Sequence, residues 1–148
     1  MPTSGGAVEP AAVEARLREE IATTLANAAP EGWDTIRYCA ATVGSIADVT
    51  VTVVVEGREE QFLDAPSVAL PRRRLRKAMY RPGEGTWFSF ALEVSRSGSV
   101  EARYDYDSEP VFHVAPAPSA WAQDQEKFPR DPENQPEWLK RRLQEATA

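Results

Sequence analysis

Apolar residues near the start of the chain recur with the period of a helix. The stripe repeats every four positions and consists of Val13, Leu17, Ile21 and Leu25. This spacing is typical of an amphipathic helix with one narrow buried face. Pro10 stands where a first helical turn tolerates proline, and PEGW at 30–33 interrupts the pattern. The sequence therefore predicts one N-terminal helix between these two points.

From residue 35 the apolar period changes to two, which predicts strands. DVTVTVVV places its alternating valines on one face and Thr50 and Thr52 on the other. Turn signals in GSIAD and EGRE divide residues 35–63 into a three-stranded meander. TWFSFALEV and SVEARYDY, joined by SRSGS, predict a second pair of strands. The proline-broken PVFHVAPAP predicts an edge strand or an extended connection.

Alternation also assigns the faces of the second strand pair. The two faces of TWFSFALEV are Trp87, Ser89 and Ala91 and, opposite them, Phe88, Phe90 and Leu92. One face of SVEARYDY consists of Val100, Ala102, Tyr104 and Tyr106. If both strands are regular, Trp87 and Phe90 lie on opposite sides of the sheet.

Three further segments have helical signals. Pro71 and Pro82 bracket a short helix in LPRRRLRKAMYRPGEG, with Leu75 and Met79 as its buried edge. APSAWAQDQEKF predicts a helical turn or two, and PEWLKRRLQEA predicts a terminal helix that starts with Pro136.

Together these elements predict the α+β class, with one antiparallel sheet of about five or six strands. An N-terminal helix, a short middle helix and C-terminal helices pack with this sheet. We expect residues 1–148 to form one domain, with 1–7 frayed and 118–148 docked on the sheet as a C-terminal helical segment.

Composition narrows the class of protein. The net charge is −6, and no apolar run approaches the roughly 20 residues that a membrane span needs. MPTSGGAVEP lacks the charged and apolar regions of a secretory signal, so we expect the protein in the cytoplasm. A single cysteine, Cys39, excludes an internal disulfide and a multi-thiolate zinc site. We expect no metal and no cofactor.

Candidate catalytic residues are few. His113 is the only histidine, so a Cys39–His113 pair is the one available thiol dyad. Cys39 falls within YCAATV, where a thiol usually fills a core. Carboxylates in DYDSEP and AQDQEKF could form a hydrolytic pair, but they have no spacing signature. Gly83 and Gly85 lack the sequence context of a phosphate loop.

Residues 72–81 carry six cations and no acid. Such a helix could follow a phosphate backbone. The other interpretation is a solvated face whose side-chain stems cover the sheet and whose charges pair with the acidic later half of the chain. Because the whole chain is acidic, we favour the second interpretation.

The C-terminal stretch WAQDQEKFPRDPENQPEWLKRRL is rich in aromatic residues for the end of a small acidic protein. Trp138, Leu139 and Leu143 share one helix face, which predicts that they pin the terminal helix to the core. For Trp121 the sequence leaves two possibilities open. It can pack inside the domain, or it can anchor a partner protein.

The order of these parts resembles the YezG-like family of antitoxin and immunity proteins. The resemblance runs from about residue 8 to residue 145. It is carried by Trp33 before the first strand, the Trp87–Phe90 segment, Gly98, the Tyr104–Asp105–Tyr106 strand end and the Trp121–Trp138 tail. The basic helix and the Pro-Arg-Asp-Pro tail are variations on that pattern, and they bear on the identity of the partner more than on the fold.

The resemblance implies a non-enzymatic bacterial protein of the cytoplasm, encoded beside a polymorphic toxin. It implies tight stoichiometric binding to the toxin's C-terminal domain, most often a nuclease, with the active site or substrate groove blocked. Neither a membrane nor direct contact with nucleic acid is expected. An acidic inhibitor also suits the cationic surface with which a nuclease binds phosphates.

On this hypothesis the toxin-binding residues are Asp105, Asp107, Glu109, Asp124 and Glu126 as charge contacts and Trp121 as the apolar anchor. Two alternatives belong to other classes. One is a nucleic-acid-associated protein that uses Arg72, Arg73, Arg74, Arg76 and Lys77. The other is a small carboxylate-dependent enzyme, which would show a concave pocket holding at least two acids with raised pKa values.

Overall fold

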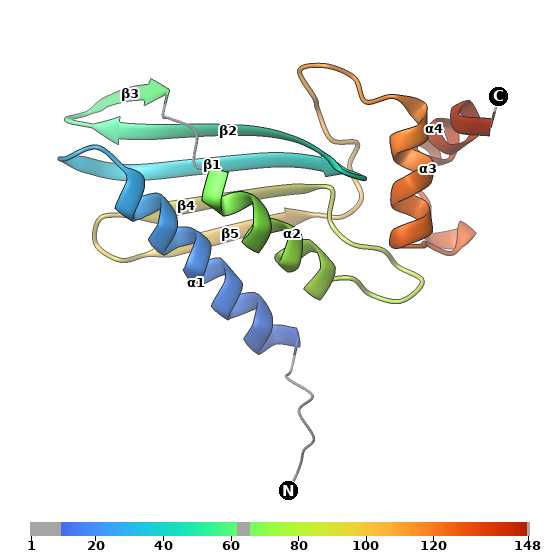
Figure 1. Ribbon diagram of the computed structural model, residues 1–148, viewed down its shortest axis with the longest axis horizontal. Helices are drawn as coiled ribbons and strands as arrows, with labels where there is room; N and C mark the ends of the chain where they lie inside the picture. Colours follow the sequence, from blue (N-terminus) through green and yellow to red (C-terminus); the bar gives the residue numbers. More distant parts are fainter. Residues whose placement is uncertain (1–9, 62–65, 148) are drawn as a thin grey trace, which may run out of the picture.

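The computed structural model describes residues 10–61 and 66–147. Its centre is one five-stranded antiparallel sheet with strand order β3-β2-β1-β4-β5, so the predicted α+β class is confirmed (Figure 1). The strands are β1 Trp33–Val43, β2 Ile46–Val55, β3 Arg58–Gln61, β4 Ser89–Ser95 and β5 Val100–Asp105. The helices are α1 Pro10–Ala28, α2 Ala69–Ala78, α3 Pro118–Lys127 and α4 Glu137–Thr147, with the short 3-10 turns η1 Pro66–Val68 and η2 Pro132–Asn134. The expected fraying of residues 1–7 lies outside the described residues.

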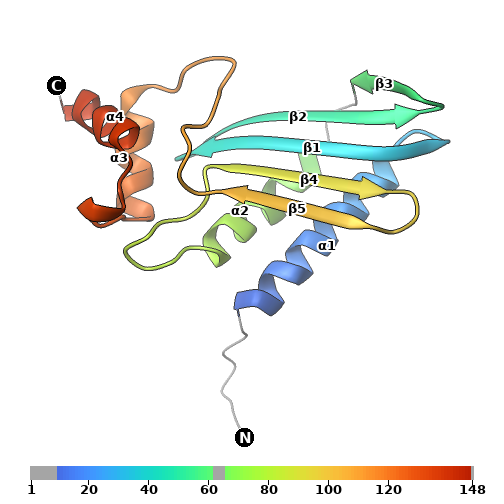
Figure 2. The ribbon, with the colours of Figure 1, turned by 180° about the vertical axis from the view of Figure 1, so that it is seen from behind.

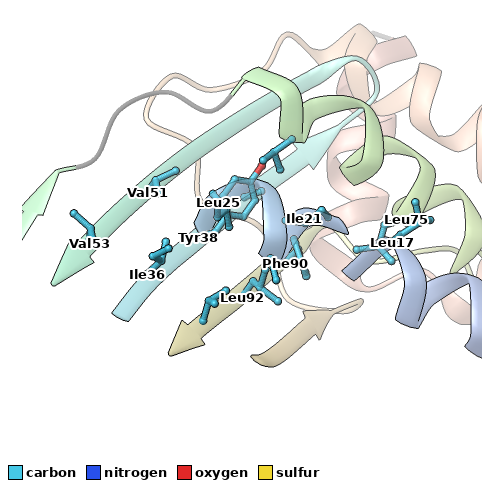
Figure 3. Packing of buried hydrophobic residues seen from close by; sticks show 14 of the residues in the cluster. Leu17, Ile21, Leu25, Ile36, Tyr38, Val51, Val53, Leu75, Phe90 and Leu92 are labelled. Carbon is cyan, nitrogen blue, oxygen red and sulfur yellow. The ribbon is translucent and has the colours of Figure 1, made fainter. Parts of the chain in front are cut away.

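Helices α1 and α2 cover one face of the sheet (Figure 1). The predicted stripe of α1 is buried at Leu17, Ile21 and Leu25, and these residues pack on inward side chains such as Ile36 and Phe90 (Figure 3). Because α1 and the sheet each bury one face, their packing forms the main hydrophobic core.

The meander forms as the alternation predicts. Val51 and Val53 point into the core from β2, whereas Thr50 and Thr52 on the other face are only partly buried. Glu56 and Gly57 link β2 to β3 with φ values of 50° and 77°. Two positive φ angles in a two-residue loop define the tight hairpin turn that matches strand twist.

The start of the fourth strand differs from the prediction. β4 begins at Ser89, and Trp87 and Phe90 lie in the same core cluster with their ring centroids 5.3 Å apart. Phe88 instead joins a second cluster. The alternation fails because residues 81–88 are not a strand: the chain there bends around Arg76 and Arg130, whose side chains bond the carbonyl oxygens of Trp87 and Thr86. PVFHVAPAP is an extended connection and not an edge strand.

The second hydrophobic cluster joins the C-terminal helices to one end of the sheet. Its buried members are Val43, Phe88, Ala120, Trp121 and Leu139. The predicted helix face of Trp138, Leu139 and Leu143 packs into this cluster. None of the helices in the described residues has the length and apolar character that a membrane crossing requires.

Candidate protein-binding surface

No described helix covers most of the sheet face opposite α1 and α2 (Figure 2). In Figure 2 strands β1, β4 and β5 lie in front of α1, and α3 and α4 stand only at one end. The connection between β5 and α3, residues 106–117, arches over the same end of this outer face (Figure 2).

Strand register sets the outward side chains in two rows across the outer face. One row runs Thr50, Cys39, Ala91, Arg103. The next runs Asp48, Ala41, Ser89, Asp105. Four neighbouring strands span about 14 Å at the usual spacing. Asp48 and Asp105 therefore stand at the two ends of a floor made of small side chains.

The two rows of side chains and the connection line an open groove of about 670 Å³. Small floor residues leave the groove hollow, since Ala41, Ser89 and Ala91 project little above the sheet. Its charged lining consists of Asp48, Asp105, Glu109, Arg103 and His113. Three carboxylates against one arginine make the groove acidic.

Hydrogen bonds fix the two aspartates. Asp105 Oδ1 accepts from the backbone N–H groups of Ser108 at 2.9 Å and Asp107 at 3.1 Å, and the Ser108 bond is the main cause of its lowered pKa. Asp48 accepts from the backbone N–H of His113 at 2.5 Å, which lowers its pKa, and contacts the His113 ring Nδ1 at 2.8 Å. Both carboxylates are therefore charged at neutral pH.

The connection forms the apolar rim of the groove. Val111 and Val114 are 87% and 81% exposed, although they are large apolar side chains. His113 between them is tied to Asp48, and Glu109 is tied to Arg142 of α4 at 2.5 Å. The connection thus presents two valines to solvent from an anchored backbone.

Two of the predicted toxin-binding residues meet in this groove, Asp105 and Glu109. Asp107 follows Asp105 but lines a different hollow beside Glu84 and Glu133. Its carboxylate accepts from Arg130 at 3.3 Å. Glu126 is exposed on α3 and does not line the groove.

Trp121 and Asp124 are not surface residues, which corrects their assignment as partner contacts. Trp121 is 3% exposed and packs against Phe88 and Trp138 at centroid distances of 5.9 and 5.6 Å. Asp124 is 5% exposed and holds Arg76 through two bonds of 2.5 and 3.0 Å. The sequence could not reveal this burial, because it depends on α3 packing against α4 and the end of β1.

The basic helix is only partly available to a nucleic acid. Arg72 and Arg76 are buried at 7% and 5% exposure. Arg72 donates to the Tyr38 hydroxyl at 2.8 Å, and Arg76 pairs with Asp124. Arg73, Arg74 and Lys77 remain exposed. The helix therefore places two of its cations inside the domain, which weakens the nucleic-acid alternative.

Cys39 is exposed on the outer face, so the expectation that it fills the core is wrong. The strand YCAATV alternates, with Tyr38 and Ala40 inward and Cys39 outward. Cys39 and His113 line the same groove, but no hydrogen bond joins them in the described residues; His113 bonds Asp48 instead.

The groove does not meet the criterion set for a carboxylate-dependent enzyme. That hypothesis required two acids with raised pKa values, whereas the pKa values of Asp48 and Asp105 are lowered. Within residues 10–61 and 66–147 no group of three or more histidine, cysteine, aspartate or glutamate side chains could hold a metal ion.

Asp48 and Arg130 are important residues that sequence reasoning missed. For Asp48 a signal existed, because the alternation of DVTVTVVV puts it on the same face as Thr50 and Thr52. Arg130 is buried among the carbonyl groups of Thr86, Tyr106 and Asn134, and its Pro-Arg-Asp-Pro context contains no signal of this burial.

Comparison of the chain with protein-family models and with curated proteins finds no match.

Proposed function

We propose that this chain is an immunity protein that binds and neutralises a cognate bacterial toxin, as its resemblance to the YezG-like family implies. The observation that carries the proposal is the acidic groove on the uncovered face of the sheet, bounded by Asp48, Asp105 and Glu109. The expected partner is the C-terminal domain of a toxin encoded by the neighbouring gene, in the cytoplasm.

Electrostatics supports a basic partner. The chain carries a net charge of −6, and the two fixed aspartates of the groove are charged at neutral pH. A nuclease toxin presents cations where it binds the phosphate backbone. An acidic inhibitor that occupies those cations blocks substrate by the same contacts that hold it, and long-range attraction speeds association.

Exposed apolar side chains support a protein partner over a small ligand. Val111 lines the groove and Val114 follows the lining residue His113, so a partner seated there would cover these exposed side chains. An interface needs an apolar centre as well as charges, because charge pairs contribute more to specificity and association rate than to affinity.

The test is co-expression of this chain with the C-terminal domain encoded by the adjacent gene. We expect a stoichiometric complex on size-exclusion chromatography and loss of the toxin's activity. The association rate should fall steeply as salt is added, since screening shortens the range of the attraction. If the two purified proteins do not associate at micromolar concentration, the proposal is wrong.

A charge-matched pair of variants relates binding to the groove. Asp105→Asn with Glu109→Gln removes two groove charges, and Asp105→Asn keeps an oxygen that can accept the turn's N–H bonds. Glu19→Gln with Glu20→Gln removes two exposed charges from α1, on the other side of the sheet. We expect the groove variant to associate at least about tenfold more slowly and the α1 variant to stay near the parent rate.

A further inference from the structure

We infer that the groove receives an arginine or lysine side chain of the bound protein, laid over the floor of Cys39, Ala41 and Ser89 with its charged end beside Asp105 and Glu109. This inference rests on the proposed function and adds to it the place and the chemistry of the central contact.

The floor has the shape that a long side chain needs. Ala41, Ser89 and Ala91 are flanked by larger residues, and the register places them side by side on β1 and β4. A lysine or arginine stem is apolar along most of its length and packs on such a surface while its charged end stays polar. A bulky floor residue would fill this space.

The walls are arranged to receive a cation. Asp105 Oδ1 accepts both backbone bonds of the turn, and the Ser108 side chain also bonds this carboxylate. Glu109 binds Arg142 through Oε2, and no described residue bonds its Oε1. The carboxylates of Asp105 and Glu109 thus line the groove on backbone and side chains that are already held in place. Binding a cation there costs little ordering entropy.

The single arginine of the groove sets the direction of the occupant. Arg103 lies on the Cys39 row, next to Ala91, and repels a cation placed near it. The aspartates lie on the adjacent row, nearer the connection. The charged end therefore points toward residues 105–113, and the partner residues next to it contact Val111 and Val114.

These features favour a protein segment over a free small cation. The groove is wide and open, which suits a side chain delivered by a larger surface. Two valines exposed beside it fit apolar neighbours of the inserted residue. A free cation would leave both valines in water.

Cys39 provides a direct test, because it is the only cysteine of the chain and lies on the groove floor. Alkylation by iodoacetamide, a small neutral reagent, is followed by mass spectrometry with and without the toxin domain. We expect saturating toxin to slow alkylation at least about tenfold, as solvent leaves the centre of an interface. In the isolated protein, Glu19→Gln should alkylate at the parent rate, and the rate of Asp105→Asn without toxin is measured as the reference for that variant.

The outcomes separate this inference from the proposed function. If a complex forms but Cys39 reacts at the free rate, the groove is not the contact and only the inference falls. If no complex forms, the proposed function is wrong.

The groove can then be tested alone, by measuring alkylation of Cys39 in the presence of an octa-arginine peptide or an octa-glutamine control. Slower alkylation with octa-arginine only, reversed by salt, supports the inference, and equal rates with both peptides overturn it.

In the complex, Asp105→Asn completes the test. Loss of a charge-assisted contact should raise the dissociation constant about tenfold. At a toxin concentration near the parent dissociation constant, Cys39 should then be alkylated faster than in the parent complex. Glu19→Gln should change neither. Equal effects of the two variants would assign the weakening to net charge and overturn the inference.

Discussion

Arg76 and Asp124 form the ion pair that connects the two hydrophobic clusters. Both side chains are buried, and the Arg76 guanidinium also lies over the rings of Phe88 and Phe128 at 5.4 and 5.0 Å. Asp124 Oδ1 accepts a further bond from the Gly44 backbone N–H. Removing one member of such a pair is costly, because the other charge stays buried without its counter-ion.

We expect Asp124→Asn to lower the free energy of unfolding by about 3–5 kcal/mol, because it leaves the Arg76 charge buried without a counter-ion. Glu93→Gln is the control, since Glu93 pairs with Arg37 at the surface. Its expected cost is below about 1 kcal/mol. Urea denaturation measures both. Similar losses in the two variants would show that burial does not govern the Arg76 pair.

The burial of single side chains is harder to predict from sequence than the helices and strands that carry them. Trp121 and Asp124 have the side chains of an interface, but α3 turns both into the protein. Cys39 has a side chain typical of a core, yet strand alternation turns it outward. Residue type alone does not show whether a side chain is covered by a neighbouring element. The strand register and the packing of the helices decide this. Asp105 was placed correctly at an exposed strand end.

At the scale of elements, the turn before β4 and the Pro-Arg-Asp-Pro tail form one unit. Gly85 has φ of 90°, and a Cβ there would stand 2.3 Å from Arg130 Nε. Asn134 donates to the Gly83 carbonyl, and Asp131 donates its backbone N–H to the same oxygen. The glycines of GEG therefore allow the side chains of Arg130 and Asp131 to pack closely against this turn. The sequence alone could not distinguish this from an ordinary turn.

Gly85→Ala and Gly57→Ala separate backbone strain from crowding. Both glycines have positive φ, but a Cβ on Gly57 meets nothing within 4 Å. We expect Gly57→Ala to cost about 1–2 kcal/mol of unfolding free energy from strain alone. Gly85→Ala should cost about 1–3 kcal/mol more, because Arg130 must move. Thermal unfolding measures the difference, and equal costs would contradict the packing of Arg130 against this turn.

The connection between β5 and α3 depends on Asp48. Its pKa is lowered from 3.8 in the folded state, first by the His113 backbone N–H. A lowered folded-state pKa stabilises the fold above the unfolded value, and this stabilisation is lost as pH falls through the folded value. Asp48→Asn should therefore destabilise by about 1 kcal/mol at pH 7, since a charged acceptor becomes neutral.

The pH dependence distinguishes this anchor from a packing effect. The difference in unfolding free energy between the parent and Asp48→Asn should shrink once the pH falls below 3.8. Glu19→Gln, at an exposed position on α1, should change stability by less than about 0.5 kcal/mol throughout. A difference for Asp48→Asn that stays constant down to pH 2 would mean that its charge plays no part.

For the whole molecule, the order of elements was predictable and their assembly was less so. Apolar periods placed the N-terminal helix, the meander and the terminal helix, because each pattern reflects one buried face. The period does not say that Phe88 and Val43 face a second cluster, since that requires α3 and α4 to return to the end of the sheet. The outer face stays open because α1 and α2 cover the opposite face and α3 and α4 pack at one end of the sheet.

The Arg76–Asp124 pair should make the two clusters unfold together. Trp33 and Trp87 pack in the first cluster, and Trp121 and Trp138 in the second. Replacing either pair with phenylalanine leaves two tryptophans that report on one cluster. In each variant, we expect urea transitions followed by tryptophan fluorescence and by far-ultraviolet circular dichroism to coincide, as two-state unfolding requires.

The same measurement with Asp124→Asn tests the role of the pair. Without it, the second cluster retains its aromatic contacts but loses the charged link to α2, so its fluorescence transition should move to lower urea than the circular dichroism transition. Separate transitions already present before Asp124 is changed would mean that the C-terminal helices are an independent unit. Coincidence in both backgrounds would mean that aromatic packing on Phe88 is enough to couple them.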